Sequence, residues 1–305
     1  MNDRTRETPT GALRRILAGS ECVMAVSAHD PLLAKLVEQA GFPMIGLSGN
    51  AVAASYLGMP DMGFLNLSDT TNVARRIAAA VSIPVLVDCD TGYGNAMAVQ
   101  RTVREFEQAG VAGIIIEDQI EYKKCGMIET AHPVVPAEEH AAKIHAACLA
   151  RMSPDFAIVA RTDAAADHGL DEALRRGFLY AEAGADALDI EVPGTPDEVE
   201  KIRQAKLPVP LKANMDEGKK LWLNDLSVLQ AAGYRIASYP GVVRYAVVRA
   251  VREALAHLKE HRSTTGIQDR LATVDEYFSA VDLERYLELE KKILQPFTAA
   301  RGTKR

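Results

Sequence analysis

The feature that most constrains the fold is a repeated pairing of a short apolar segment with an amphipathic stretch. The apolar segments are 23–28, 44–49, 84–90, 113–118, 157–163, 187–191, 209–214 and 235–240. A helical pattern follows each of them, often opened by Asp, Ser or Thr and often closed by Gly, as helix caps are. Eight such units predict an α/β chain folded as a (β/α)8 TIM barrel, with a doubly wound open sheet as the alternative.

The domain organisation follows from length and from what comes after the eighth strand. The chain has 305 residues without a linker or a break in composition, so we expect a single barrel domain, 1–305. Helical patterns continue over 242–262 and about 273–297, which is more than one barrel helix requires. Because 273–297 is amphipathic, we expect these extra C-terminal helices to pack on another subunit as an oligomerisation region.

Composition excludes several classes of function. A net charge of −6 and a pI near 5.7 argue against a nucleic acid or an anionic membrane as partner. The N-terminus lacks the apolar core of a signal peptide, and no apolar run approaches the roughly 20 residues of a membrane span. The four cysteines form no CxxC pair and no zinc spacing, which favours a reducing, cytoplasmic setting.

Polar residues close most of the predicted strands. They are Asp88, Asp90, Glu117, Asp118, Arg161, Asp163, Glu191, Asn214 and Tyr239. In a barrel such residues meet at one rim, where active sites lie. Asp88 and Asp90 are two residues apart and so share a face. Two buried carboxylates need a counter-ion, and their oxygens suit Mg²⁺, or alternatively Mn²⁺. For Asp118 and Asp163, an N-cap or a salt bridge to an outer helix is the competing interpretation.

The stretch "YKKCGM", residues 122–127, places a thiol beside two ammonium groups and a glycine. Neighbouring cations favour the thiolate form of a cysteine, and glycine allows the backbone to bend. This pattern suits a proton-transferring Cys125 on a mobile loop. The alternative is a solvated loop with an incidental cysteine.

Taken together, five segments resemble the isocitrate lyase/phosphoenolpyruvate mutase superfamily. In order they are "SGNAVAASYLGMPD" (48–61), "VDCDTGYGNA" (87–96), "EDQIEYKKCG" (117–126), "ARTDA" (160–164) and "KANM" (212–215). The resemblance covers about residues 10–262. It implies a (β/α)8 barrel, a homotetramer with C-terminal helices exchanged between neighbours, bound Mg²⁺, and a 2-oxo or 2-hydroxy carboxylate as substrate.

The resemblance also implies roles for individual residues. The metal site would be Asp61, Asp88, Asp90 and Glu117, some of them acting through water. The substrate would be held by Ser48, Gly49, Asn50, Asp88, Arg161, Glu191 and Asn214. The catalytic residues would be Arg161 together with Lys123 and Cys125 of a gating loop, where both flanking lysines would tune the thiol.

Within the superfamily, "KKCG" resembles the branch of carbon–carbon lyases. The function implied is Mg²⁺-dependent cleavage of a 2-hydroxy di- or tricarboxylate, similar to 2-methylisocitrate or dimethylmalate, through an enolate that Cys125 protonates. The alternatives are an oxaloacetate hydrolase or decarboxylase, and a phosphonate-processing enzyme similar to carboxyphosphonoenolpyruvate mutase. A non-catalytic metabolite-binding protein is a third.

Four features depart from the family pattern. Met127 stands where most lyases have His, segment 128–140 is about one residue longer than usual, and Gly46 replaces a common aromatic residue. The fourth is Asp189, where the lyases mostly carry an apolar residue.

Side-chain alternation places Asp189 and Lys212 on the same faces as Glu191 and Asn214, on neighbouring strands. A lone buried charge is costly, so we predict a direct Asp189–Lys212 salt bridge beneath the pocket floor.

Overall fold

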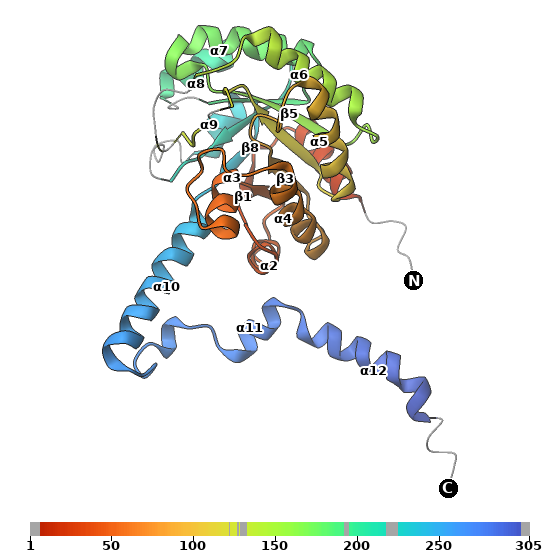
Figure 1. Ribbon diagram of the computed structural model, residues 1–305, viewed down its shortest axis with the longest axis vertical. Helices are drawn as coiled ribbons and strands as arrows, with labels where there is room; N and C mark the ends of the chain where they lie inside the picture. The colour runs from red at the N-terminus through yellow and green to blue at the C-terminus, as the bar shows by residue number, and fades with distance from the viewer. Residues whose placement is uncertain are drawn as a thin grey trace. The chain divides into compact units, whose positions relative to one another are not determined.

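The computed structural model describes residues 7–121, 123–126, 128, 133–191, 195–217 and 225–299. Its eight strands are parallel and close a barrel in sequence order, with β8 paired to β1 (Figure 1). The strands are β1 (Val23–Val26), β2 (Met44–Leu47), β3 (Val85–Asp88), β4 (Gly113–Glu117), β5 (Ala157–Thr162), β6 (Ala187–Ile190), β7 (Leu211–Asn214) and β8 (Tyr234–Tyr239). The predicted (β/α)8 barrel is confirmed, and the open sheet is excluded.

The helices of the barrel alternate with the strands. They are α1 (Pro9–Ala18), α2 (Pro31–Gln39), α3 (Gly49–Val52) with the π-helical turn η1 (Ala53–Leu57), α4 (Leu67–Ala80), α5 (Ala96–Gln108), α6 (Ala137–Ala150), α7 (Ala165–Glu182), α8 (Pro196–Ala205) and α9 (Leu226–Ala231). Side chains of Asp30, Thr195 and Asp225 accept N–H bonds at the amino ends of α2, α8 and α9. The capping signals in the sequence therefore mark real helix starts.

Side chains alternate along the strands, so the barrel has two hydrophobic cores, one on each face of its sheet. Leu86 belongs to a cluster inside the barrel, whereas Val85 and Val87 pack between strands and helices. The interior cluster also contains Leu13 and Ile16 of α1, together with residues at the amino ends of β4, β5 and β6. Helix α1 therefore covers the amino end of the barrel, and the carboxyl end is left for a site.

The chain divides into two compact units, Met1–Tyr245 and Ala246–Arg305. The helices after β8 are α10 (Val242–His261), η2 (Gln268–Arg270), α11 (Val274–Ala280) and α12 (Leu283–Ala299). The helical segment expected at 273–297 is thus two helices, because Asp282 between them takes a left-handed φ of 56°. Among the described residues, no helix has the length and apolar character needed to cross a bilayer.

Large apolar side chains of the second unit are exposed. They include Val248, Val251, Leu255 and Leu258 of α10, Tyr277 and Phe278 of α11, and Tyr286, Leu289, Ile293 and Leu294 of α12. The amphipathic pattern read from the sequence is therefore present as apolar helix faces that the unit itself does not bury.

Candidate active site

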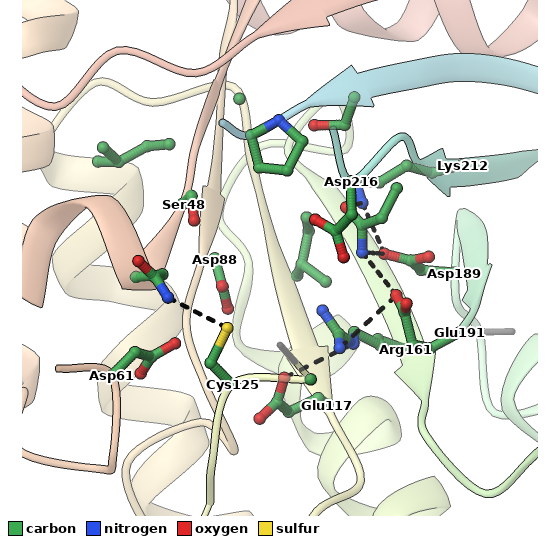
Figure 2. A pocket seen from close by; sticks show the side chains of 18 of the residues that line it. Ser48, Asp61, Asp88, Glu117, Cys125, Arg161, Asp189, Glu191, Lys212 and Asp216 are labelled. Atoms are coloured by element: carbon green, nitrogen blue, oxygen red, sulfur yellow. Dashed lines mark hydrogen bonds and ion pairs between the residues drawn. The ribbon is translucent and has the colours of Figure 1, made fainter. Parts of the chain in front are cut away.

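A pocket opens at the carboxyl ends of the strands (Figure 2). Of the predicted site residues, those that line it are Ser48, Asn50, Asp61, Asp88, Glu117, Lys123, Cys125, Arg161, Glu191 and Asn214. The other two lie directly behind this lining. Gly49 donates its N–H to Asp88 Oδ2 at 3.2 Å, and Asp90 accepts from Lys123 Nζ. The structure therefore brings all twelve predicted residues together.

The first wall of the pocket is acidic, and we define it by Asp61, Asp88, Asp90 and Glu117. The ammonium group of Lys123 lies within this wall, 3.2 Å from Asp61 Oδ1 and hydrogen-bonded to Asp90 Oδ1. Its side chain is buried. This differs from the expectation that Lys123 acts on the neighbouring thiol, because carboxylates compete for the ammonium group more strongly than a thiol does.

Burial and Lys123 together set the protonation of the first wall. Burial raises the pKa of Asp90 to about 6, although Lys123 opposes the shift. Burial also raises the pKa of Glu117 well above its usual range. At Asp88 burial is outweighed by Lys123, Arg161 and two backbone N–H groups, so its pKa is lowered. Lys123 stays charged, since the surrounding acids more than offset its burial and raise its pKa.

The first wall fits a hydrated divalent ion. Glu117 Oε1 is buried and has no hydrogen-bond partner within the described part of the chain. In that same part, no three acidic, His or Cys side chains converge closely enough to ligate an ion directly. Mg²⁺ commonly keeps several waters and takes only one or two carboxylates from a protein. The first wall therefore suits Mg²⁺ held partly through water, as the sequence implied.

The loop that carries Asp90 is held rigidly. Asp90 itself has a left-handed φ of 48°. The hydroxyl of Thr102 on α5 donates to the carbonyl of Gly92 at 2.9 Å, and the ammonium of Lys143 on α6 donates to the carbonyl of Thr91 at 3.1 Å. Outer helices therefore fix the backbone of the glycine-rich stretch 91–95, and they fix the acid beside it.

Cys125 faces the pocket beside the first wall (Figure 2). Asn50 Nδ2 lies 3.1 Å from its Sγ, and its backbone N–H donates to the carbonyl of Asp61 at 3.1 Å. These contacts tie the thiol to the loop after β2, which carries Ser48 and Gly49. The pocket position favours a chemical role over an incidental cysteine. Met127 lies outside the described residues.

Arg161 stands between the first wall and the opposite side of the pocket. It donates two hydrogen bonds to Asp163, at 2.7 and 3.0 Å, and lies 3.6 Å from both Glu117 and Glu191. Burial would lower its pKa, but Asp163, Glu191 and Glu117 outweigh burial and raise it. Asp163 is thus a partner of Arg161 and not a helix cap.

Asp118, the neighbour of Glu117, is a structural residue. It accepts from Thr162 Oγ1, Arg176 Nη1 and Tyr180 Oη at 2.7–2.9 Å, and from the Asp163 backbone N–H at 2.9 Å. Arg176 and Tyr180 come from α7. The salt bridge to an outer helix, which was one of the two interpretations of Asp118, is therefore confirmed.

The second wall of the pocket is formed by Asp189, Glu191, Lys212 and Asn214. Lys212 Nζ donates to Asp189 Oδ2 at 2.6 Å and to Asn214 Oδ1 at 2.7 Å. Asn214 Nδ2 in turn donates to Glu191 Oε2 at 2.7 Å. The predicted Asp189–Lys212 salt bridge is confirmed, and the strand alternation on which it depended is correct in this half of the barrel.

Sequence reasoning missed several pocket residues, namely Gln119, Asp216, Ser238 and Arg244. Tyr239 was taken as the residue that closes the last strand, but it packs outward against the helix layer. Ser238, one residue earlier, faces the pocket instead. The parity of "RIASYP" could have shown this, because Ile236 lies in the interior cluster and Ser238 is two residues further.

The active sites of (β/α)8 barrel enzymes lie at this carboxyl rim, so the acidic groups and the thiol gathered there place the protein in the class of barrel enzymes. The family model described as phosphoenolpyruvate phosphomutase matches residues 13–259. The chain is 41% identical over 278 residues to 2,3-dimethylmalate lyase of Eubacterium barkeri, covering 91% of this chain and 96% of that protein. It is 36% identical over 291 residues to probable 2-methylisocitrate lyase 1 of Corynebacterium glutamicum, covering 95% and 94%.

Comparison with solved structures leads to the same family. The fold matches a phosphoenolpyruvate phosphomutase from Streptomyces platensis subsp. rosaceus with a TM-score of 0.88 and 33% identity, over 93% of this chain and 99% of the other. It matches a phosphonopyruvate hydrolase in complex with oxalate and Mg²⁺ with a TM-score of 0.85 and 36% identity, over 94% and 99%. The chain belongs to the phosphoenolpyruvate mutase family, within the isocitrate lyase superfamily, and is an enzyme of its carbon–carbon lyase branch.

Proposed function

We propose that this enzyme cleaves a substituted malate, a 2-hydroxy dicarboxylate or tricarboxylate, into a 2-oxo acid and a second carboxylic acid. The observation that carries the proposal is that the thiol of Cys125 faces the same pocket as the first wall and Arg161. A carbon–carbon lyase needs these three parts: an acid, a cation site and an anion clamp. The lyase relatives support the same reaction class.

The residues divide the work as follows. Asp61, Asp88, Asp90 and Glu117 would hold the divalent ion, Mg²⁺ or Mn²⁺, some of them through water. The ion would supply polarisation of a substrate carboxylate and the adjacent oxygen. A carboxylate of the substrate binds to the loop after β2, at Ser48, Gly49 and Asn50. Arg161 stabilises the negative charge that develops on the substrate.

Cys125 supplies the proton. A carboxylate of the first wall takes up the 2-hydroxyl proton, the bond between C2 and C3 breaks, and its electron pair becomes the enolate of the departing acid. The thiol protonates that carbon in cleavage and, as thiolate, removes the same proton in condensation. Gly126 lets the loop that carries Cys125 close over the bound acid and exclude water.

Product analysis tests the reaction. The protein with Mg²⁺ is given 2,3-dimethylmalate, 2-methylisocitrate, oxaloacetate and phosphonopyruvate, and the products are followed by NMR. Pyruvate with a second acid supports the lyase. Oxalate with acetate from oxaloacetate would show a hydrolase, pyruvate with CO₂ a decarboxylase, and cleavage or rearrangement of the carbon–phosphorus bond a phosphonate enzyme.

We further propose that the enzyme is a cytoplasmic homotetramer whose segment 273–297 packs across a subunit interface. The exposed apolar faces of α11 and α12 support this, since faces of this kind are buried in assemblies. Deleting residues 273–305 should lower the number of subunits measured by light scattering. An unchanged subunit count would contradict the proposal.

A further inference from the structure

The floor of the pocket on the side of the second wall has polar groups that the proposed mechanism does not use. Lys212 has three N–H donors, and two of them go to Asp189 and Asn214. Within the described residues it has no further partner. Because Asn214 lies two residues further along β7, the ammonium group reaches up to the level of Asn214 and lines the pocket.

Ser238, on the neighbouring strand β8, lines the same pocket. The register of β7 and β8 pairs Asn214 with Ser238. Its hydroxyl has no hydrogen bond to another described residue. A Cβ atom on Gly46 would lie 3.0 Å from Ser238 Oγ, so the missing side chain at Gly46 leaves space over this hydroxyl. We call Lys212, Ser238 and Gly46, with Asp189 beneath, the floor subsite.

The charge of the floor subsite is already balanced. Asp189 Oδ2 is 2.6 Å from Lys212 Nζ, and both side chains are almost fully buried. Glu191 and Asp216 also line the pocket as acids, and Arg244 lines it as a cation. Arg161, between the walls, is shared by Asp163, Glu117 and Glu191. A further carboxylate on the floor would therefore meet more negative than uncommitted positive charge.

We propose that the floor subsite binds a hydroxyl group carried by a substituent of the substrate. This inference rests on the proposed function, because it assumes that the reacting 2-hydroxy acid lies against the first wall. A hydroxyl oxygen accepts the third N–H of Lys212 and exchanges a hydrogen bond with Ser238. A methyl group there would leave both polar groups unpaired, which is costly in a buried site. The enzyme is thereby specific for hydroxyalkyl malates.

A matched series of three substrates tests the specificity. The three are 2-methylmalates that carry methyl, hydroxymethyl or carboxymethyl at C3. Cleavage of each gives pyruvate, together with propionate, 3-hydroxypropionate or succinate. We expect kcat/KM for the hydroxymethyl compound to exceed the other two by about tenfold or more, the scale of one buried hydrogen bond. Equal values, or a preference for methyl or carboxymethyl, would overturn the proposal.

Binding separates this proposal from the proposed function. The corresponding 2-methylsuccinates lack the 2-hydroxyl and cannot be cleaved, so calorimetry reports only their affinity. Tighter binding of the hydroxymethyl compound without turnover of any malate would refute the lyase and keep the floor subsite. Turnover with no preference in either measurement, or no binding of any of the three at millimolar concentration, would refute the floor subsite.

Variants test whether the preference for the hydroxymethyl substrate arises at the floor subsite. Ser238→Ala, and the paired change Asp189→Leu with Lys212→Met, should each reduce the ratio of hydroxymethyl to methyl kcat/KM by about tenfold. The single change is small and keeps the test valid if the paired variant fails to fold. The control is Asp186→Asn, which breaks bonds to Arg14 and Arg151 at the amino end of the barrel and should leave the ratio unchanged. A ratio unmoved by Ser238→Ala would contradict the assignment.

Discussion

The two walls of the pocket each surround a lysine with acids, yet the two lysines are held differently. Lys123, in the first wall, comes from the loop after β4, whereas Lys212, in the second, comes from strand β7. A strand residue is fixed by ladder hydrogen bonds, while a loop residue can move away. The two walls therefore differ in the backbone that carries their cation, which is a loop in the first wall and a strand in the second.

The balance of charge leads to the same distinction. The ammonium group of Lys123 contacts two of the four acids of the first wall, Asp61 and Asp90, and Glu117 Oε1 has no hydrogen-bond partner among the described residues. In the second wall, Lys212 is matched by Asp189 at 2.6 Å. An excess of buried carboxylates needs a further cation, and a matched pair does not. We therefore assign chemistry to the first wall, and support and specificity to the second.

Asp88→Ala should have the largest effect on activity. Losing this acid should lower kcat by about a thousandfold or more, because several kcal/mol of metal-assisted charge stabilisation are lost. The protein should stay folded by circular dichroism, and Mn²⁺ binding measured by calorimetry should weaken. Asp171→Ala, at an exposed acid, is the control. Full activity of Asp88→Ala in excess chelator would sink the assignment of the first wall.

Lys212→Met should be the most destabilising change in the second wall. It leaves Asp189 buried without its cation, so we expect a loss of roughly 3–5 kcal/mol in the free energy of unfolding. Urea denaturation measures this. The paired variant Asp189→Leu with Lys212→Met removes both charges and should recover most of the stability. Equal stability of wild type and Lys212→Met would show that the two walls do not differ as we describe.

Cys125→Ser should reduce turnover by about a hundredfold while substrate affinity changes little, which is the usual scale for a general acid. Single-turnover kinetics and calorimetry separate the two quantities. Cys148→Ser is a matched control, because this thiol donates to the carbonyl of Gly184 away from the pocket. Wild-type turnover of Cys125→Ser would remove the thiol from the mechanism and favour the hydrolase or decarboxylase.

Gly46→Ala should give the smallest effect. The new Cβ would lie 3.0 Å from Ser238 Oγ, so we expect roughly fivefold weaker binding of substrate from about 1 kcal/mol of crowding. Adding Ser238→Ala removes the opposing oxygen and should relieve the crowding for the methyl substrate. If Gly46→Ala alters no affinity, the space over Ser238 is not used by the substrate.

Much of the site could be predicted from the sequence because strands alternate with a period of two. That rule correctly placed Asp189 with Lys212. It does not account for Asp90, because β3 ends at Asp88 and Asp90 takes a left-handed φ of 48°. It failed at the last strand only because Tyr239 was chosen in place of Ser238. The family motifs added Ser48, Asn50 and Asp61, to which no strand pattern pointed.

The sequence by itself determined the barrel, the acidic rim and the buried pair of the second wall, since these follow from periodicity and from the cost of an unpaired charge. Three features were decided by the tertiary structure alone. They are the ion-pair partners of Lys123, the hydrogen bonds that Asp118 accepts, and the space beside Ser238 at Gly46. Each depends on distances between segments far apart in the chain: Lys123 meets Asp61 and Asp90, and Asp118 meets Arg176 of α7. The local sequence does not predict such distances, because only the closed barrel brings these segments together.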